Sequence, residues 1–143
     1  MGEVVLMTIE EIYRLAKNTL LVNGCDEENA KAVADTVSKA ERDGSVSHGL
    51  FRLPGYVASL RSKKVNGSAR PKVETLTKSA VRVQGDYGFA PMALKVGIPA
   101  LIDITKDTGV GVLTLLNIHH FAALWHETES LAEQGLIGMA CTA

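Results

Sequence analysis

The chain has 143 residues, of which 46% are hydrophobic and 22% are charged, values typical of a single globular domain. This composition excludes a disordered, collagen-like or coiled-coil protein. Because 15 Lys and Arg are balanced by 16 Asp and Glu, the formal net charge is -1, and we expect neither nucleic acid nor a membrane surface as a partner.

Two helices are predicted in the first third of the chain. Thr8 and Glu11 have the spacing of a capping box, and apolar residues then repeat at helical intervals over residues 9–22. Asp26 can cap a second helix, which Gly44 is placed to end. We expect these two amphipathic helices to pack against each other as a hairpin.

A third helix is predicted in the segment SVSHGLFRLPGYVASLRS. Ser47 can serve as its N-cap, and Pro54 is expected to break or kink any helix that runs through it. Residues 62–71 contain Lys, Asn, Gly, Ser and Pro without periodicity, so they are predicted to form a loop.

The middle of the chain predicts a small β-hairpin followed by a helix. β-Branched residues alternate in two runs that a short polar break separates: Val73, Thr75 and Thr77, then Val81 and Val83. Pro91 suits the first turn of the helix, and Gly109 is expected to end it. Pro99 lies inside this helix and is expected to bend it.

The last third of the chain predicts a parallel βαβ unit. The apolar run 110–116 has the length and β-branching of a buried strand, residues 122–134 can form a helix, and residues 136–142 resemble a second buried strand. GVG at 109–111 lacks a third glycine and precedes a strand, which excludes a Rossmann fingerprint.

The sequence therefore predicts an α/β protein that is not a Rossmann fold. A helical amino-terminal segment, 1–66, is followed by the hairpin and the βαβ unit in 67–143. A parallel unit buries both faces of its strands, yet the sequence ends at its last apolar run. We expect the chain to be truncated, the front part of a larger protein.

The cysteines and the amino terminus indicate the compartment. Cys25 and Cys141 are too few for a disulfide framework and match no metal-binding or redox spacing, so both are predicted to be free thiols. The first residues, MGEVVLMTIEE, lack the basic and apolar regions of a secretory signal. A cytoplasmic protein is therefore expected.

His48 and Arg52 are the residues that most directly suggest chemistry. A histidine can donate a proton near neutral pH, and an arginine can bind a carboxylate through two parallel hydrogen bonds. If a helical turn follows Ser47, the four-residue spacing places both side chains on one face, which suits a small 2-oxo or 2-imino acid. The alternative is that Ser47 only caps a helix, His48 is solvated and Arg52 pairs with a surface acid.

A second group of polar residues, NIHHFAALWHE, follows the apolar run 110–116. Ligands of α/β sheets bind at the carboxyl ends of strands, and the first amides of a helix favour phosphate, so a cofactor phosphate is expected there. The histidines and Glu127 of this segment lack the spacing of a zinc site, and we predict no bound metal. Alternatively, Phe121, Leu124 and Trp125 are core residues and the histidines are their solvated neighbours.

Four segments resemble the amino-terminal part of the malate/L-lactate dehydrogenase family of NAD(P)-dependent reductases: RDGSVSHGLFRLPGYVASLRS, VNGSARPKV, GVGVLTLLNIHHFAALW and AEQGLIGMACT. That family does not use a Rossmann fold. HHFAALW is most similar to the branch that reduces the cyclic ketimines Δ1-piperideine-2-carboxylate and Δ1-pyrroline-2-carboxylate to pipecolate and proline. The resemblance covers essentially the whole chain, although members of the family are considerably longer.

The resemblance implies a role for each candidate residue. His48 would donate a proton, with Ser47 beside it in a relay, and Arg52 would bind the substrate carboxylate. Residues 67–143 would be the first part of the cofactor-binding domain, and a homodimer is implied. Five consecutive residues would line the site of NADP or NAD: His120, Phe121, Ala122, Ala123 and Leu124.

The resemblance thus predicts an NAD(P)H-dependent reductase of cyclic imino acids. A dehydrogenase of 2-oxo acids, of the malate or lactate type, is the alternative within the same family. A third interpretation is a catalytically inactive module whose last strand pairs with a partner protein.

Overall fold

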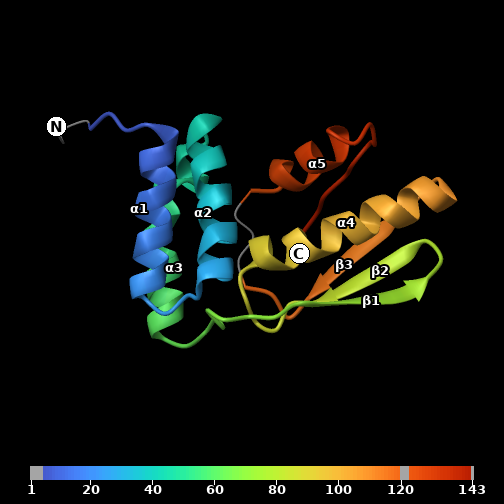
Figure 1. Cartoon of the computed structure of the whole chain (residues 1–143), viewed down its shortest axis with the longest axis horizontal. Helices are drawn as coiled ribbons and strands as arrows, with labels where there is room; N and C mark the ends of the chain where they lie inside the picture. The colour runs from blue at the N-terminus through green and yellow to red at the C-terminus, as the bar shows by residue number, and fades with distance from the viewer. Residues whose placement is uncertain (1–4, 120–122, 143) are drawn as a thin grey trace.

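Helices α1 to α3 stand together at one end of the molecule, and a three-stranded sheet with α4 and α5 forms the other end (Figure 1). The structure is a computed structural model and describes residues 5–119 and 123–142. Its α/β class is the predicted one. In chain order the elements are α1 (Ile9–Val22), α2 (Glu27–Arg42), the 3₁₀ turns η1 (Val46–His48) and η2 (Leu50–Arg52), α3 (Leu53–Arg61), β1 (Lys72–Thr77), β2 (Ala80–Gln84), α4 (Ala90–Thr108), β3 (Val112–Leu116) and α5 (Trp125–Ala132).

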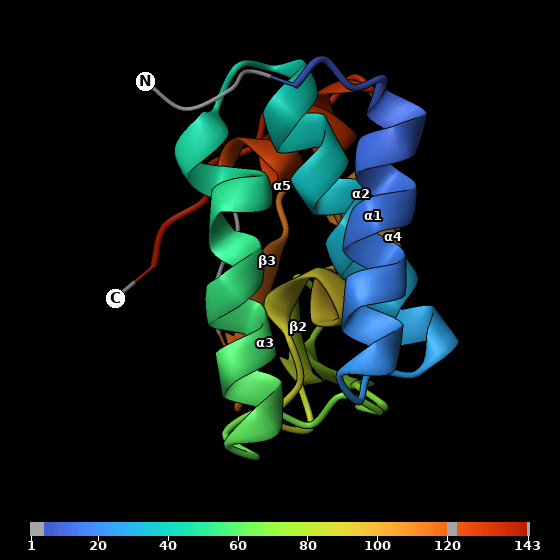
Figure 2. The same ribbon diagram turned by 90° about the vertical axis from the view of Figure 1, so that its left-hand side faces the viewer.

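The first two helices form where the sequence predicts them. Thr8 and Glu11 make a reciprocal capping box at the start of α1, in which each side chain accepts the other residue's amide hydrogen. Asp26 caps α2 by accepting a hydrogen bond from the amide of Asn29 at 3.0 Å. The two helices pack as the predicted hairpin (Figure 2), and their facing stripes are buried: Ala16, Leu20, Val33 and Val37.

The third helix begins later than the sequence predicts. Residues 46–52 form two single 3₁₀ turns, and Ser47 lies inside the first of them, so its prediction as an N-cap is wrong. Pro54 does not break a helix. It lies in the first turn of α3, where the missing amide hydrogen costs no intrahelical hydrogen bond. The loop predicted over residues 62–71 is confirmed.

The sheet has the strand order β1-β2-β3. β1 and β2 form the predicted antiparallel hairpin, in which Val73 lies opposite Val83 and Thr75 lies opposite Val81. β2 and β3 are parallel and are joined through α4, which packs on the sheet. At the contact, a Cβ on Gly97 would lie 2.9 Å from Val83 Cγ2, so the absent side chain lets the helix approach the strand closely.

The parallel unit lies one element earlier than predicted. It consists of β2, α4 and β3, whereas residues 136–142 form no strand. The helix predicted over residues 122–134 is confirmed as α5. A strand needs a neighbouring strand for its amide and carbonyl groups. Among residues 5–119 and 123–142 no strand pairs with the second edge of β3, so the last apolar run has no ladder to join.

Helix α4 is a continuous helix of 19 residues. Pro91 lies in its first turn and Gly109 caps its end with a φ of +81°, as the sequence predicts. Pro99 lies inside the helix and, lacking an amide hydrogen, leaves the carbonyl of Lys95 without its usual intrahelical donor. Within the described ranges, no helix combines the length and the apolar character that a bilayer crossing requires.

A hollow of about 790 Å³ lies between α4, β3, α5 and residues 136–142. Its lining is mainly apolar but includes Glu127, whose side chain is buried and whose Oε2 has no hydrogen-bond partner among the residues that the structure describes. Burial raises the pKa of Glu127 above its ordinary value, although its own backbone amide acts in the opposite direction. The hollow does not include residues 47–52.

Replacing Glu127 with Gln is expected to stabilise the fold near neutral pH by about 1 kcal/mol, because burying a carboxylate with one oxygen unpartnered is costly. A glutamate whose pKa is raised on folding loses stability as pH rises from its unfolded-state pKa through its folded-state pKa. The gain should therefore be present at about pH 7 and vanish near about pH 4, where both states are protonated. Denaturant unfolding at both pH values measures it.

The matched control is Glu133→Gln, which removes an exposed carboxylate just after α5. It should change the free energy of unfolding little at either pH. A Glu127→Gln protein that is less stable than the parent at neutral pH would show that the carboxylate has a partner that stabilises it.

Candidate active site

His48 is held in η1 by two serine hydroxyls. Its Nδ1 lies 2.9 Å from Ser47 Oγ and 3.3 Å from Ser45 Oγ, and its side chain is half-buried. Because the hydroxyls occupy Nδ1, Nε2 is the nitrogen available to a substrate. The sequence identified His48 and Ser47, whereas it gave no reason to select Ser45.

Arg52 ends η2, four residues after His48, and is half-buried. Its Nε donates a hydrogen bond to the backbone carbonyl of Ser47 at 2.9 Å. Its two terminal nitrogens make no ion pair or hydrogen bond with any of the described residues. Among the described residues, Arg52 therefore does not form the alternative ion pair with a surface acid. The free edge of the guanidinium can bind a carboxylate through two hydrogen bonds.

Ser47 connects the two candidate residues. Its hydroxyl contacts the imidazole of His48, and its carbonyl accepts the hydrogen bond from Arg52. The helical turn that the sequence predicts between His48 and Arg52 is replaced by two 3₁₀ turns that meet at Gly49. His48 and Arg52 nevertheless lie in one short segment whose own hydrogen bonds connect them through Ser47.

Trp125 closes the site on the side of α5. Its indole packs edge to face against the His48 imidazole, with 5.8 Å between ring centroids, and its Nε1 donates to Asp43 Oδ2 at 3.1 Å. The sequence interpretation treated Trp125 only as a core residue. No local signal could reveal the contact, because Asp43 and Trp125 are 82 positions apart.

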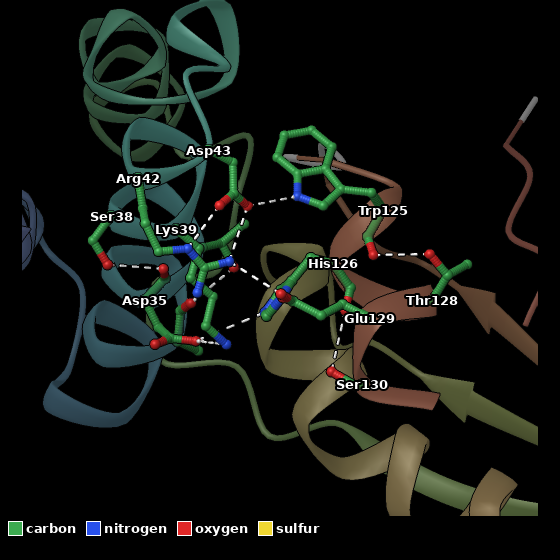
Figure 3. A network of polar contacts seen from close by, with 12 residues as sticks. Asp35, Ser38, Lys39, Arg42, Asp43, Trp125, His126, Thr128, Glu129 and Ser130 are labelled. Carbon is green, nitrogen blue, oxygen red and sulfur yellow. Dashed lines mark hydrogen bonds and ion pairs between the residues drawn. The ribbon is translucent and has the colours of Figure 1, made fainter. Parts of the chain in front are cut away.

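A polar network fastens α5 to the end of α2 beside the site (Figure 3). Arg42 pairs with both Asp43 at 2.7 Å and Glu129 at 3.0 Å, and His126 lies 3.7 Å from carboxylate oxygens of Asp35 and Glu129. Burial, followed by the charge of Lys39, lowers the pKa of the His126 imidazole, and the two carboxylates only partly oppose this effect. The network holds α5 against the end of α2, where Trp125 lies next to His48.

The second candidate segment is described only in part. His120, Phe121 and Ala122 lie outside the described residues. Ala123 is buried and Leu124 is half-buried, directly before α5. Their predicted contact with a cofactor remains a prediction.

The histidine before that segment has a structural contact. His119 Nε2 lies 3.1 Å from Ser59 Oγ, and its backbone amide donates to the carbonyl of Gly88 at 2.8 Å. These contacts join the residues after β3 to α3 and to the segment just before α4. Among residues 5–119 and 123–142, no group of three or more His, Cys, Asp or Glu is placed to hold a metal ion.

The cysteines offer no nucleophile to the site. Both are free, as predicted, with Cys25 buried and Cys141 exposed. Burial, together with the charge of Asp26, raises the pKa of Cys25 to about 11, so its thiol stays protonated at neutral pH. The roles of His48 and Arg52 in a reaction remain a prediction.

Curated relatives of the chain are named as reductases. A Δ1-pyrroline-2-carboxylate reductase of Ancylobacter novellus is 40% identical to this chain, over 100% of the chain and 44% of the relative. A Δ1-pyrroline-2-carboxylate/Δ1-piperideine-2-carboxylate reductase of Pseudomonas syringae pv. tomato is 42% identical, over 91% of the chain and 38% of the relative. The chain thus spans less than half the length of these relatives.

Solved structures share the fold. A crystal structure of Δ1-piperideine-2-carboxylate reductase from Pseudomonas syringae pv. tomato has a TM-score of 0.88 and 41% identity, covering 92% of this chain and 40% of that one. Malate dehydrogenase from Pyrococcus horikoshii OT3 has a TM-score of 0.84 and 28% identity, covering 94% and 40%. The family model for malate/L-lactate dehydrogenase matches residues 7–143. The chain belongs to the malate/L-lactate dehydrogenase family.

Proposed function

We propose that this protein is an NAD(P)H-dependent reductase of cyclic imino acids such as Δ1-pyrroline-2-carboxylate and Δ1-piperideine-2-carboxylate. The observation that supports it most is the segment 45–52, which presents a histidine with Nε2 available and an arginine with an unpaired guanidinium edge. The names of the relatives at 40% and 42% identity favour the same substrates.

The two residues divide the work on such a substrate. Arg52 pairs with the carboxylate and thereby fixes the orientation of the adjacent carbon–nitrogen double bond. His48 gives a proton from Nε2 to the imine nitrogen as the neighbouring carbon gains a hydride, so the carbon–nitrogen double bond becomes a single bond and one C–H and one N–H bond form. Ser47 and Ser45 hold Nδ1 and keep the ring oriented.

A reduced nicotinamide, when bound, supplies the hydride. Residues 120–124 are the proposed lining of its site, and the described part of the segment fits this role. Ala123 and Leu124 come after β3, at whose carboxyl end ligands of parallel sheets bind, and directly before Trp125, which touches His48.

The test is oxidation of NADPH and NADH by the purified chain, followed by absorbance, with each cyclic imine, pyruvate and oxaloacetate offered separately. We expect turnover of the cyclic imines. Preference for pyruvate or oxaloacetate would instead assign the 2-oxo acid reaction. Failure to turn over any of the four, together with no detectable binding of NADPH, would contradict the proposal and support a structural module.

Two further expectations belong to this proposal: a cytoplasmic enzyme, which the two free cysteines favour, and a homodimer, which the resemblance implies. Light scattering on the purified chain measures its mass in solution. A mass of one chain at the concentrations of the assay would contradict the dimer.

A further inference from the structure

We propose that Glu41 is a positioning residue for the His48–Arg52 pair, an inference that rests on the proposed function. Glu41 lies in the last turn of α2 and is half-buried. Its Oε1 accepts a hydrogen bond from the backbone amide of Leu50 at 2.7 Å. Leu50 begins η2 and lies midway between His48 and Arg52 in the sequence.

The amide of Leu50 is the one point at which residues 46–52 are hydrogen-bonded to α2 within the described structure. The other hydrogen bonds of this segment connect its own residues, as between Arg52 and Ser47, lead back to Ser45, or join Leu50 to Leu53, the first residue of α3. A carboxylate accepting from a backbone amide forms a charge-assisted hydrogen bond, which is stronger than one between neutral groups. Glu41 therefore holds the middle of the segment, between His48 and Arg52, against α2, while the amide of Ser45, which donates to the carbonyl of Ala40 at 2.8 Å, holds the residue before the segment.

Gly49 supports the same assignment. It is buried between the two 3₁₀ turns, and a Cβ at this position would overlap the carboxyl group of Glu41. The absent side chain is what allows the carboxylate to reach the Leu50 amide. Gly49 and Glu41 thus act together: the absent side chain of Gly49 makes room for the carboxylate of Glu41, which binds the Leu50 amide.

Positioning and proton relay require different properties of residue 41. A relay needs a group that can gain and lose a proton, whereas positioning needs only an oxygen that accepts a hydrogen bond. Glutamine keeps that oxygen and cannot exchange a proton. Comparing Glu41→Gln with Glu41→Ala therefore separates the two roles.

The experiment measures kcat, KM and the pH profile of imine reduction, and the hydrogen-exchange rate of the Leu50 amide by NMR. Glu41→Ala should speed Leu50 exchange by about tenfold or more and lower kcat/KM by about tenfold or more, since hydrogen bonds to charged groups contribute this much. Both kcat and KM should worsen, because His48 and Arg52 move together. Glu41→Gln should stay within about threefold of the parent and keep its pH profile.

Two variants complete the design. Glu133→Ala, which removes an exposed glutamate, should change neither readout. Gly49→Ala displaces the Glu41 carboxylate without removing it, so it should reproduce the loss seen in Glu41→Ala, and combining the two should cost little more than either alone. It also replaces Glu41→Ala as the test variant if that protein does not fold.

The outcomes separate this inference from the proposed function. Equal losses of kcat/KM in Glu41→Gln and Glu41→Ala would overturn the positioning role by showing that the charge is needed. Unchanged exchange of the Leu50 amide in Glu41→Ala would overturn it by showing that Glu41 does not hold this amide. If the chain reduces no substrate, the proposed function fails, but Leu50 exchange in the same variants still decides whether Glu41 holds the segment.

Discussion

Replacing His48 with Ala is expected to lower kcat for imine reduction by about 100-fold or more, because a positioned proton donor contributes at least that much. KM should change little, since the carboxylate is bound by Arg52. The histidine is suited to this role because the hydroxyls of Ser45 and Ser47 hold Nδ1 and leave Nε2 to the substrate. Steady-state kinetics of the two proteins across a range of pH measures the effect.

His126→Gln is the matched histidine control. It removes an imidazole that contacts Asp35 and Glu129 at the α2–α5 interface, so it should affect stability more than turnover. Turnover in His48→Ala within about threefold of the parent would remove His48 from the chemistry, because a general acid cannot be lost at so small a cost.

Replacing Arg52 with Ala is expected to raise KM for the cyclic imine by a factor of about 30 or more, as loss of about 2–5 kcal/mol requires when a desolvated carboxylate loses its partner. Arg52→Lys should recover only part of the loss, because an ammonium group cannot form two parallel hydrogen bonds with a carboxylate. The measurement is KM and kcat for each protein with Δ1-pyrroline-2-carboxylate.

Arg61→Ala is a suitable control, since Arg61 ends the neighbouring helix α3, is exposed and pairs with Asn23 at 2.8 Å. It should leave KM unchanged. A KM in Arg52→Ala equal to that of the parent would place the substrate carboxylate elsewhere.

Local signals in the sequence were sufficient for most of the fold. The capping box of Thr8, the N-cap of Asp26 and the left-handed Gly109 act within a few residues of the helix ends that they define. The alternating residues of β1 and β2 likewise pair across a short turn. Such features can be read from sequence because their physical causes are local.

Pairings between distant segments were not accessible in this way. The run 136–142 has the composition of a strand, but a strand depends on a partner, and the parallel neighbour of β3 proved to be β2. The effect of Pro54 was ambiguous for a similar reason. A proline breaks a helix when it lies inside but fits its first turn, and only the structure shows that α3 starts just before Pro54.

The candidate site shows the same division. The types and spacing of His48 and Arg52 suggested their chemistry, whereas a role for Ser47 beside His48 came only from the family resemblance. Trp125 reaches His48 only because the Arg42–Glu129 ion pair and the Trp125–Asp43 hydrogen bond bring α5 against α2. A contact across so many residues leaves no spacing signal in a single sequence.

If His48 and Arg52 form one site for an imino acid, both should respond to a planar analogue that cannot be reduced. Binding of such an analogue, pyrrole-2-carboxylate, is the most direct test of this site. As pyrrole-2-carboxylate is added in the presence of NADPH, the NMR signals of the His48 imidazole and the Arg52 Nε–H group should shift together and give the same dissociation constant. Arg52→Ala should abolish the shift of the His48 signal. Absence of saturable binding, or binding that leaves both signals unmoved, would contradict the claim.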